Sequence, residues 1–350
     1  MRRPAARVRT AALARAVPAP SPLPLLLAGG ALLLGAVLAA VPARAEAPPA
    51  PAAIAVEAGQ RAEVVRALAA ALRERYVFPE VGEKVAAGLE ARLAAGDFDR
   101  HPTAAAFADG LTGLVMPLAD DRHLRVRHPA SRPPRATPSL RADPAAHNYG
   151  VARADVLAGN VGYLKLDGFL APTAPARAAI DAAMATLAGA DALVVDLREN
   201  GGGSPGMVAY LSGYLVAERT HLNDIFTRHP GRTTGDTEEF WAEPRGGAAS
   251  FAGKPVYVLT ARYTFSGAEE FANNLKELKR AIIVGETTGG GANPGDIVPL
   301  GHGFDAFVPT GRAINPISGT NWEGRGVAPD IAVPAPQALE AALAALAKSL

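Results

Sequence analysis

The chain contains no cysteine, which excludes disulfide bonds, thiolate zinc sites, iron–sulfur clusters and a cysteine nucleophile. It also lacks a dominant charge, because 35 Lys and Arg residues stand against 34 Asp and Glu residues, and no basic stripe indicates a nucleic-acid surface. The metal-binding pattern H-E-x-x-H and the phosphate-binding pattern G-x-x-x-x-G-K-[ST] are absent as well. We therefore expect no metal, no organic cofactor and no nucleic-acid partner.

The residues that are present have a composition typical of a globular protein, with 49% hydrophobic and 20% charged residues. At roughly 150 residues per domain, a chain of 350 residues is long enough for one large domain or two modest ones. Glycine and proline, with 36 and 30 residues, stay below the share that characterises low-complexity chains. The sequence thus predicts a folded protein with a substantial core.

The N-terminus has the three parts of a secretory signal peptide. Five arginines precede an apolar run at Leu25–Ala40, and a small-residue A-x-A site follows at Ala43–Ala45. We predict that residues 1–45 are a signal peptide cleaved after Ala45, and that the protein is exported to the periplasm or the extracellular space. Retention of this segment as a membrane anchor is the alternative, and it is the only membrane contact that we expect. Cleavage would change the formal net charge from +1 to −5, because residues 1–45 hold six Arg and no acidic residue.

Beyond a flexible Pro/Ala-rich lead-in at 46–60, the pattern of residues 61–118 is helical. Apolar residues recur there at helical spacing, namely Val64, Val65, Leu68, Leu72 and Tyr76. We predict a small all-helical N-terminal domain at 61–118 with no chemistry of its own. A stretch rich in Pro and Arg, at 129–148, is predicted to be a loop or linker.

From residue 119 the chain alternates strand and helix patterns, which predicts an α/β core at 119–335. The predicted strands are 161–166, 192–197, 255–260 and 281–285, and helical patterns at 174–187 and 266–280 lie between them. The run ALVVDL at 192–197 is apolar at nearly every position, as expected of a strand that is buried on both faces. Residues 295–333 have an irregular, β-rich pattern, and a closing helix is predicted within 336–350.

Ser266 lies where a predicted buried strand passes into a helix. Ligands of α/β folds bind at the carboxyl ends of such strands. The backbone N–H of Gly267, at the N-terminus of that helix, would point toward an oxyanion formed next to Ser266. The same residues also form a capping box, S-x-x-E with Glu269, which needs no catalytic role. The segment alone leaves both interpretations open.

A glycine-rich loop, Gly201–Gly203, follows the other predicted buried strand. Consecutive glycines let the backbone approach a ligand closely and present its N–H groups. An ordinary glycine turn is the alternative. The nucleophile-elbow pattern G-x-S-x-G is absent, because Thr264 and Ala268 flank Ser266.

Four segments together carry a resemblance to a known family. DLRENGGG, TFSGAEEFA, VGETTGGG and NWEGRGVAPDI resemble, in order and spacing, the core of the S41 serine peptidases. That family includes the tail-specific (carboxy-terminal processing) proteases, the tricorn core and the interphotoreceptor retinoid-binding protein. Upstream, ALRERYVFPEVGEKVAAGL and LADDRHLRV are similar to the helical cap of the retinoid-binding-protein-like branch. The resemblance covers roughly residues 60–335.

The resemblance implies a crotonase-like α/β core capped by a small helical domain. About 37 residues separate His123 from the next predicted strand, too few for an inserted PDZ domain. By the same resemblance, Ser266 takes the position of the nucleophile. The N–H of Gly267, with that of Gly202 or Gly203, takes the position of the oxyanion hole.

The general base distinguishes the branches of this family. The tail-specific branch uses a lysine downstream of the serine, but no lysine occurs between Lys279 and Lys348. Lys279 lies 13 residues into the Ser266 helix, about 20 Å along its axis, so it cannot reach the hydroxyl. The tricorn-like arrangement uses a histidine, and His123 in DDRHLRV matches its position. Glu323 takes the position of the tricorn glutamate, which is expected to orient the ring.

We therefore predict an exported serine peptidase that hydrolyses peptide bonds through an acyl-enzyme on Ser266, with His123 as the base and Glu323 as its partner. The expected substrates are peptides or unfolded proteins. Two alternatives stay open. The same residues could serve an esterase of small acyl substrates, or a crevice between cap and core could carry a hydrophobic ligand without catalysis.

Overall fold

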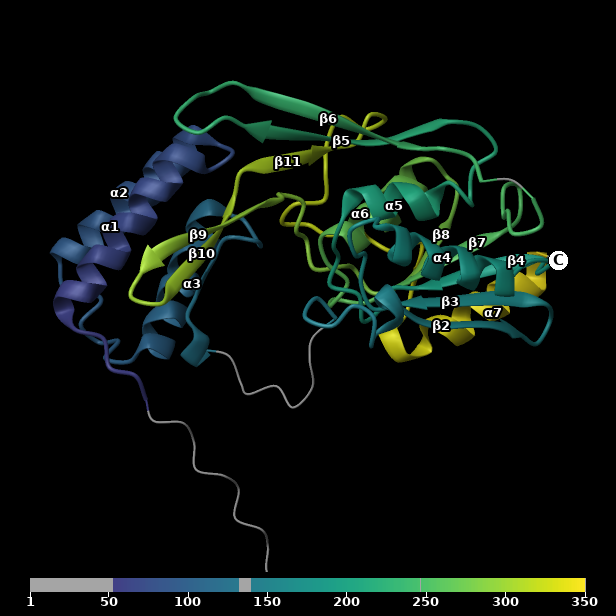
Figure 1. Ribbon diagram of the computed structural model, residues 1–350, viewed down its shortest axis with the longest axis horizontal. Helices are drawn as coiled ribbons and strands as arrows, with labels where there is room; N and C mark the ends of the chain where they lie inside the picture. Colours follow the sequence, from purple (N-terminus) through teal and green to yellow (C-terminus); the bar gives the residue numbers. More distant parts are fainter. Residues whose placement is uncertain (1–52, 132–139, 246, 350) are drawn as a thin grey trace, which may run out of the picture. The chain divides into compact units, whose positions relative to one another are not determined.

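The computed structural model describes residues 53–131, 140–245 and 247–349. The predicted signal segment at 1–45 lies outside the described residues, as do most of the lead-in and part of the predicted loop at 129–148. Within the described residues, no helix is both long enough and apolar enough to cross a lipid bilayer. The predicted α/β class with a helical N-terminal region is confirmed (Figure 1).

The elements follow the chain in this order. The helices are α1 (Ala58–Arg75), α2 (Pro79–Ala94), α3 (Ala104–Ala119), α4 (Ala174–Thr186), α5 (Pro205–Ser212), α6 (Gly267–Glu277) and α7 (Ala338–Ser349). The strands are β1 (Arg125–Arg127), β2 (Val151–Leu157), β3 (Val161–Leu166), β4 (Ala192–Asp196), β5 (Thr220–Arg228), β6 (Gly235–Ala242), β7 (Val256–Thr260), β8 (Ile282–Gly285), β9 (Gly295–Gly301), β10 (Phe304–Pro309), β11 (Gly311–Ile314) and β12 (Ile331–Ala332). The four strands predicted at 161–166, 192–197, 255–260 and 281–285 are all present, as β3, β4, β7 and β8.

A six-stranded sheet lies at the centre of the α/β core, with the strand order β12-β8-β7-β4-β3-β2 (Figure 1). Its neighbours pair in parallel, except that β2 pairs antiparallel with β3. Every residue of β4 and β7 is buried. This confirms that the continuous apolar runs are strands covered on both faces.

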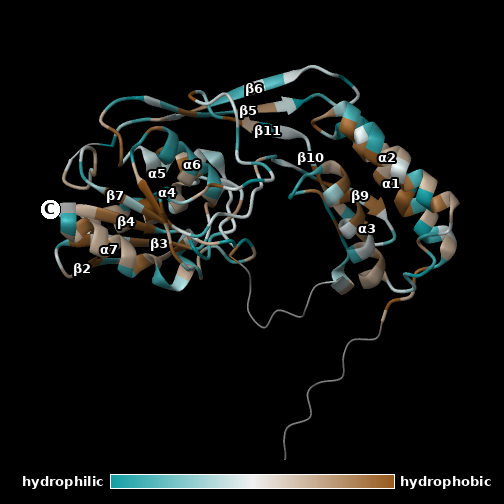
Figure 2. Cartoon of the chain, turned by 180° about the vertical axis from the view of Figure 1, so that it is seen from behind, coloured by the Kyte–Doolittle hydropathy of each residue, from teal (hydrophilic) through white to brown (hydrophobic). Residues whose placement is uncertain are grey.

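Successive residues of these strands pack against different layers of helices, because side chains alternate between the two faces of a sheet. Leu193 and Val195 of β4 belong to the core shared with α4, α5 and α6, whereas Val194 belongs to the core shared with α7. Figure 2 shows the central strands β3 and β4 in hydrophobic colours and β6 mostly in hydrophilic ones. The parallel strands thus direct their carboxyl ends, which carry Ser266 and the first glycine loop, to one edge of the sheet.

The N-terminal helices bury their apolar faces against strands from the far end of the chain. Helices α1, α2 and α3 share a core with a three-stranded sheet of order β1-β10-β9. Phe107 of α3 meets Phe304 of β10 edge to face, with ring centroids 5.5 Å apart. The prediction of an all-helical unit at 61–118 did not include these strands, because the helical periodicity contains no signal for a partner so distant in sequence.

A third sheet, of order β11-β5-β6, contains a long hairpin that the sequence analysis did not predict. The burial along β5 does not alternate cleanly between buried and exposed residues, so period-2 patterning gives little signal there. Arg228, the last residue of β5, donates a hydrogen bond to the carbonyl of Tyr76 at 2.6 Å. The hairpin therefore contacts the chain at the end of α1.

Candidate active site

The predicted nucleophile Ser266 occupies a sharp turn between β7 and α6. Its backbone angles are φ +55° and ψ −125°, a strained conformation for a residue that carries a Cβ. A strained strand-to-helix turn is also the feature by which a nucleophile elbow exposes its serine, although the G-x-S-x-G pattern is absent here. Ser266 lines a small cavity next to this turn.

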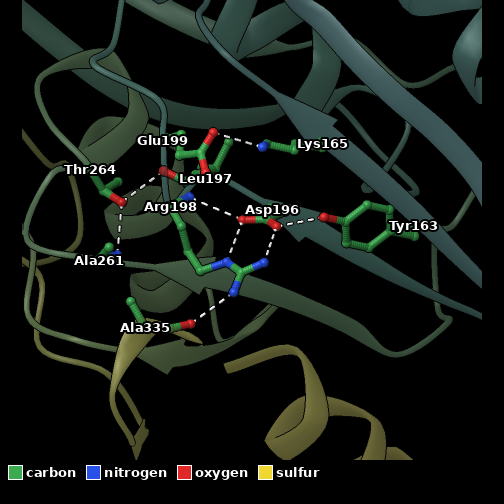
Figure 3. A network of polar contacts seen from close by, with 9 residues as sticks. All are labelled: Tyr163, Lys165, Asp196, Leu197, Arg198, Glu199, Ala261, Thr264 and Ala335. Carbon is green, nitrogen blue, oxygen red and sulfur yellow. Dashed lines mark hydrogen bonds and ion pairs between the residues drawn. The ribbon is translucent and has the colours of Figure 1, made fainter. Parts of the chain in front are cut away.

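Hydrogen bonds attach the turn to the end of β4 (Figure 3). Thr264 Oγ1 donates to the carbonyl of Leu197 at 2.8 Å and accepts the N–H of Ala261 at 3.0 Å. The Thr264 side chain is buried, so no water competes for these bonds. They connect the Ser266 turn to the strand that leads into the first glycine loop.

An ion pair joins Arg198 to Asp196, the last residue of β4 (Figure 3). Arg198 donates two parallel hydrogen bonds to the Asp196 carboxylate, at 2.9 and 2.6 Å, and Tyr163 donates to the same carboxylate at 2.6 Å. Burial raises the pKa of Asp196, but the bonds from Arg198 and Tyr163 outweigh burial and hold this pKa below its usual value. The glycine loop therefore begins from a rigid strand end.

The first glycine loop lies against the turn that precedes α6. Gly203 has φ +147°, and a Cβ there would lie 1.8 Å from the carbonyl oxygen of Phe169, so only glycine fits. The N–H of Gly202 donates to Asn200 Oδ1 at 2.8 Å. The N–H groups of Gly203 and Gly267 have no acceptor among the described residues. Gly203 is therefore the loop glycine with an available donor next to Gly267.

Glu269 joins the Ser266 turn to the second glycine-rich loop. Its buried carboxylate accepts the N–H of Ser266 at 2.9 Å and those of Gly290 and Gly291 at 2.6 and 2.8 Å. It also accepts the hydroxyl of Thr288 at 2.5 Å. The sequence identified Glu269 only as a helix cap, because its other partners lie some twenty residues downstream and give no local signal.

His123 precedes β1, and its ring packs beside the Ser266 turn. Its centroid lies 4.5 Å from the ring centroid of Phe265 and 5.5 Å from that of Phe307. A Cβ at Gly291 would come within 2.7 Å of His123 Cε1, so a side chain at that position would displace the imidazole. The structure thus brings His123 into contact with the residue adjacent to Ser266.

The electrostatic surroundings keep His123 neutral. Burial lowers its pKa to about 4, with a smaller contribution from the positive charge of Arg125. A neutral imidazole can accept a proton at pH 7. Its Nδ1 is buried and has no hydrogen-bond partner, and no hydrogen bond joins the ring to Ser266 or Glu323 in the part of the chain that the structure describes.

Two carboxylates approach the histidine. One side-chain atom each of Asp121, His123 and Glu323 lies within 4.8 Å of the other two. Glu323 accepts the backbone N–H groups of Arg122 and Ala292, at 2.9 and 2.5 Å. Burial first, and then the negative charge of Asp121, raise the pKa of Glu323 to about 7. The predicted base and its predicted partner are therefore neighbours.

Asp121 is a site residue that the sequence analysis missed. Its carboxylate is buried and accepts the backbone N–H of His123, the hydroxyl of Tyr76 and the amide of Asn293, each at 2.9 Å. The only sequence signal was its place two residues before His123. The spacing of Asp121, His123 and Glu323 could hold a divalent cation, but both carboxylates already accept several hydrogen bonds. Because Asp121 accepts the N–H of His123, we assign it the role of positioning the histidine backbone.

Two cavities meet at Gly203. The smaller, of about 50 Å³, is lined by Ser266, Gly267 and residues of β5, β11 and the second glycine-rich loop. The larger, of about 410 Å³, has Tyr149 and Phe169 in a mainly apolar lining. Both cavities therefore border the first glycine loop, and the smaller one also borders Ser266.

Comparisons with known proteins identify the family of the chain. The family model "Peptidase family S41" matches residues 160–333, and the model "N-terminal domain of Peptidase_S41 in eukaryotic IRBP" matches residues 51–154. A solved structure from Parabacteroides merdae is 18% identical and aligns with a TM-score of 0.60, over 82% of this chain and 96% of that chain. This similarity shows that the two proteins share a fold.

Curated relatives match about half of the chain. Carboxyl-terminal-processing peptidase 2, chloroplastic, from Arabidopsis thaliana is 29% identical over 189 residues, which cover 50% of this chain and 32% of that protein. A carboxy-terminal-processing protease from Bartonella bacilliformis is 30% identical over 188 residues, which cover 51% of this chain and 40% of that protein. The matches thus span well under half the length of these relatives.

Proposed function

Because the chain belongs to peptidase family S41, we propose that it hydrolyses peptide bonds through an acyl-enzyme formed on Ser266. The observation that carries this proposal is a strained serine at the start of α6, beside two backbone N–H groups without acceptors among the described residues. Strained backbone is concentrated at functional sites, where the surrounding structure holds it in place. The contact of His123 with Phe265 supports the assignment of the base.

The proposed reaction begins when the Ser266 hydroxyl adds to the carbonyl carbon of a peptide bond and transfers its proton to neutral His123. The resulting oxyanion accepts hydrogen bonds from the N–H groups of Gly203 and Gly267. The C–N bond then breaks, and the imidazolium gives its proton to the leaving amine. Water attacks the ester by the same route, which releases the acid and restores the serine.

Glu323 stabilises the imidazolium in this scheme. A histidine with a pKa of about 4 is a weak base on its own, so an ionised carboxylate within 4.8 Å favours the proton transfer. The unpartnered Nδ1 of His123 is the atom that would donate to Glu323. Catalytic hydrogen bonds are often long in unliganded enzymes and shorten when substrate binds.

Labelling with a fluorophosphonate tests the nucleophile. The wild-type protein should be labelled, and Ser266→Ala should not. Ser318→Ala, a control at an exposed serine that does not line the Ser266 cavity, should label like the wild type. Hydrolysis of unfolded peptides, compared with p-nitrophenyl esters, then separates a peptidase from an esterase. A folded wild-type protein that resists the probe and cleaves neither substrate would refute the proposal.

The larger cavity supports one second candidate, a carrier of a hydrophobic ligand. Its volume of about 410 Å³ and its aromatic lining are of the size and kind that bind small apolar molecules. Native mass spectrometry of the protein purified without detergent tests this candidate. A bound lipid in a protein that no fluorophosphonate labels would favour the carrier over the peptidase.

We also propose that the protein is exported, with residues 1–45 removed after Ala45, and that it acts on peptides or unfolded proteins outside the cytoplasm. The arginines, apolar run and A-x-A site of the N-terminus support this placement. N-terminal sequencing of the protein recovered from its producing cells is the test. A chain that begins at Met1 and partitions into membranes would indicate an anchor instead.

A further inference from the structure

The small cavity beside Ser266 contains one carboxyl group that the proposed reaction does not use. Glu270 lies one helical turn after Ser266 on α6, and its N–H donates to the Ser266 carbonyl at 2.9 Å. Residues four positions apart share a helix face, and both of these side chains line the cavity. Glu270 is only 4% exposed, and its Oε1 is buried without a hydrogen-bond partner. An unpaired buried carboxyl destabilises the fold, so its presence needs an explanation.

The remaining side chains that line the cavity offer little else to a polar ligand. Ile225, Pro294 and Ala313 are apolar. Trp322 carries a single donor, and this N–H is already bonded to the carbonyl of Gly291 at 2.8 Å. Apart from the nucleophile itself, Glu270 is therefore the side chain in this lining that can recognise a polar atom.

The size of the cavity limits what it accepts. A buried site needs about 10–15 Å³ of such space for each water molecule. The cavity of about 50 Å³ therefore holds a side chain of about four non-hydrogen atoms. Serine, threonine, alanine and valine side chains fit this limit, whereas lysine, arginine and aromatic side chains exceed it.

The state of the Glu270 carboxyl selects among the small side chains. Burial alone raises its pKa to about 8, and none of the other side chains that line the cavity is charged. The carboxyl is therefore protonated at neutral pH, so it can donate one hydrogen bond and accept others. A hydroxyl group complements both capacities, while a methyl group would leave the carboxyl unpaired.

We propose that Glu270 makes this cavity a specificity pocket for a small hydroxyl-bearing side chain, serine or threonine, on the residue whose carbonyl Ser266 attacks. The inference rests on the proposed peptidase function. The Cβ of that residue is two bonds from the reacting carbon, and the pocket adjoins Ser266, Gly203 and Gly267, the groups assigned to that carbon and its oxygen. Of the side chains that flank the cleaved bond, this one is the nearer to the pocket.

The test uses peptide substrates that differ only at the residue before the cleaved bond. Threonine and valine have the same shape, so the ratio of their kcat/KM values isolates the hydroxyl group. We expect the wild-type protein to prefer threonine over valine, and serine over alanine, by about tenfold, the factor expected of one buried hydrogen bond. Glu270→Gln keeps a donor and an acceptor and should retain the preference, whereas Glu270→Met should reduce the ratio to about one.

The wild-type ratio tests the inference even if Glu270→Met fails to fold. Ala313→Val, which narrows the pocket from β11, gives an independent check, because it should reduce cleavage after threonine and valine more than cleavage after alanine. Equal cleavage after threonine and valine, an undiminished ratio in a folded Glu270→Met variant, or faster cleavage after lysine would each overturn the inference. Absence of both cleavage and fluorophosphonate labelling would instead overturn the proposed function.

Discussion

Replacing Glu270 by glutamine should change how the stability of the protein depends on pH. Glutamine has the shape of a protonated glutamate but cannot ionise. In the folded chain, burial raises the pKa of Glu270 from 4.5 to about 8. The folded state therefore holds a proton between these pH values that the unfolded state releases. It follows that the free energy of unfolding of the wild type falls as pH rises through this range.

The magnitude follows from the difference between the two pKa values. At ~1.4 kcal/mol for each pKa unit, a rise from 4.5 to about 8 corresponds to about 5 kcal/mol between pH 4 and pH 8.5. Glu270→Gln lacks this contribution, while every other titrating group is common to both proteins. The free energy of unfolding of the variant, relative to that of the wild type, should therefore increase by about 5 kcal/mol from pH 4 to pH 8.5.

Urea unfolding, followed by circular dichroism at pH 4.5, 6, 7.5 and 8.5 in one mixed buffer, measures the difference. Glu277→Gln, near the end of the same helix, controls for the loss of one acidic side chain from α6. The difference between Glu270→Gln and the wild type should grow with pH, and the two curves should be closest at the acidic end. Parallel curves for the two proteins would show that Glu270 is not held protonated, and would remove the basis for its role in recognition.

Three further perturbations test the site and its supports. Activity should rise with pH through an apparent pKa of about 7, because the scheme needs ionised Glu323 beside neutral His123. Glu323→Gln should abolish this rise in a profile of kcat/KM against pH. The same rise in the variant would show that another group causes it. Thr264→Val should lower the free energy of unfolding by about 2 kcal/mol in urea melts, since it leaves the buried backbone N–H of Ala261 without an acceptor, and a change near zero would contradict that account. Asp196→Ala should lower it by ~3–5 kcal/mol, because Arg198 loses its carboxylate partner, and a thermal scan that matches the wild type would refute this.

The parts of the fold that could be predicted are those encoded by local patterns. The run at 192–197 is apolar at nearly every position, and a strand buried on both faces is the simplest structure that explains it. Proline at the start of α2 and the serine before α6 mark helix boundaries in the sequence itself. The β5–β6 hairpin lacks such a pattern, because its burial depends on contacts with β11 and with the end of α1.

The candidate site could be predicted only as far as its motifs extend. Ser266, His123 and Glu323 lie in segments that resemble the family. In the structure, His123 contacts Phe265, the residue before Ser266, and lies within 4.8 Å of Glu323. The sequence could not show whether Gly202 or Gly203 offers a free N–H group next to Gly267. The N–H of Gly202 is already bonded to the side chain of Asn200, and this bond exists only in the folded chain. The long-range partners of Asp121, such as the Tyr76 hydroxyl, exist only after folding, so no sequence pattern reveals them.

The packing of the N-terminal helices on β9 and β10 has a consequence for the timing of assembly. Strand β1, which begins two residues after His123, pairs with β10, so that Arg125 lies opposite Phe307. The ribosome makes the first partner long before the second, and pairings so distant along the chain form late. The imidazole therefore reaches its place beside the serine only when almost the whole polypeptide has emerged. A nascent chain that has not yet reached β10 therefore lacks the contact between His123 and the turn that carries Ser266.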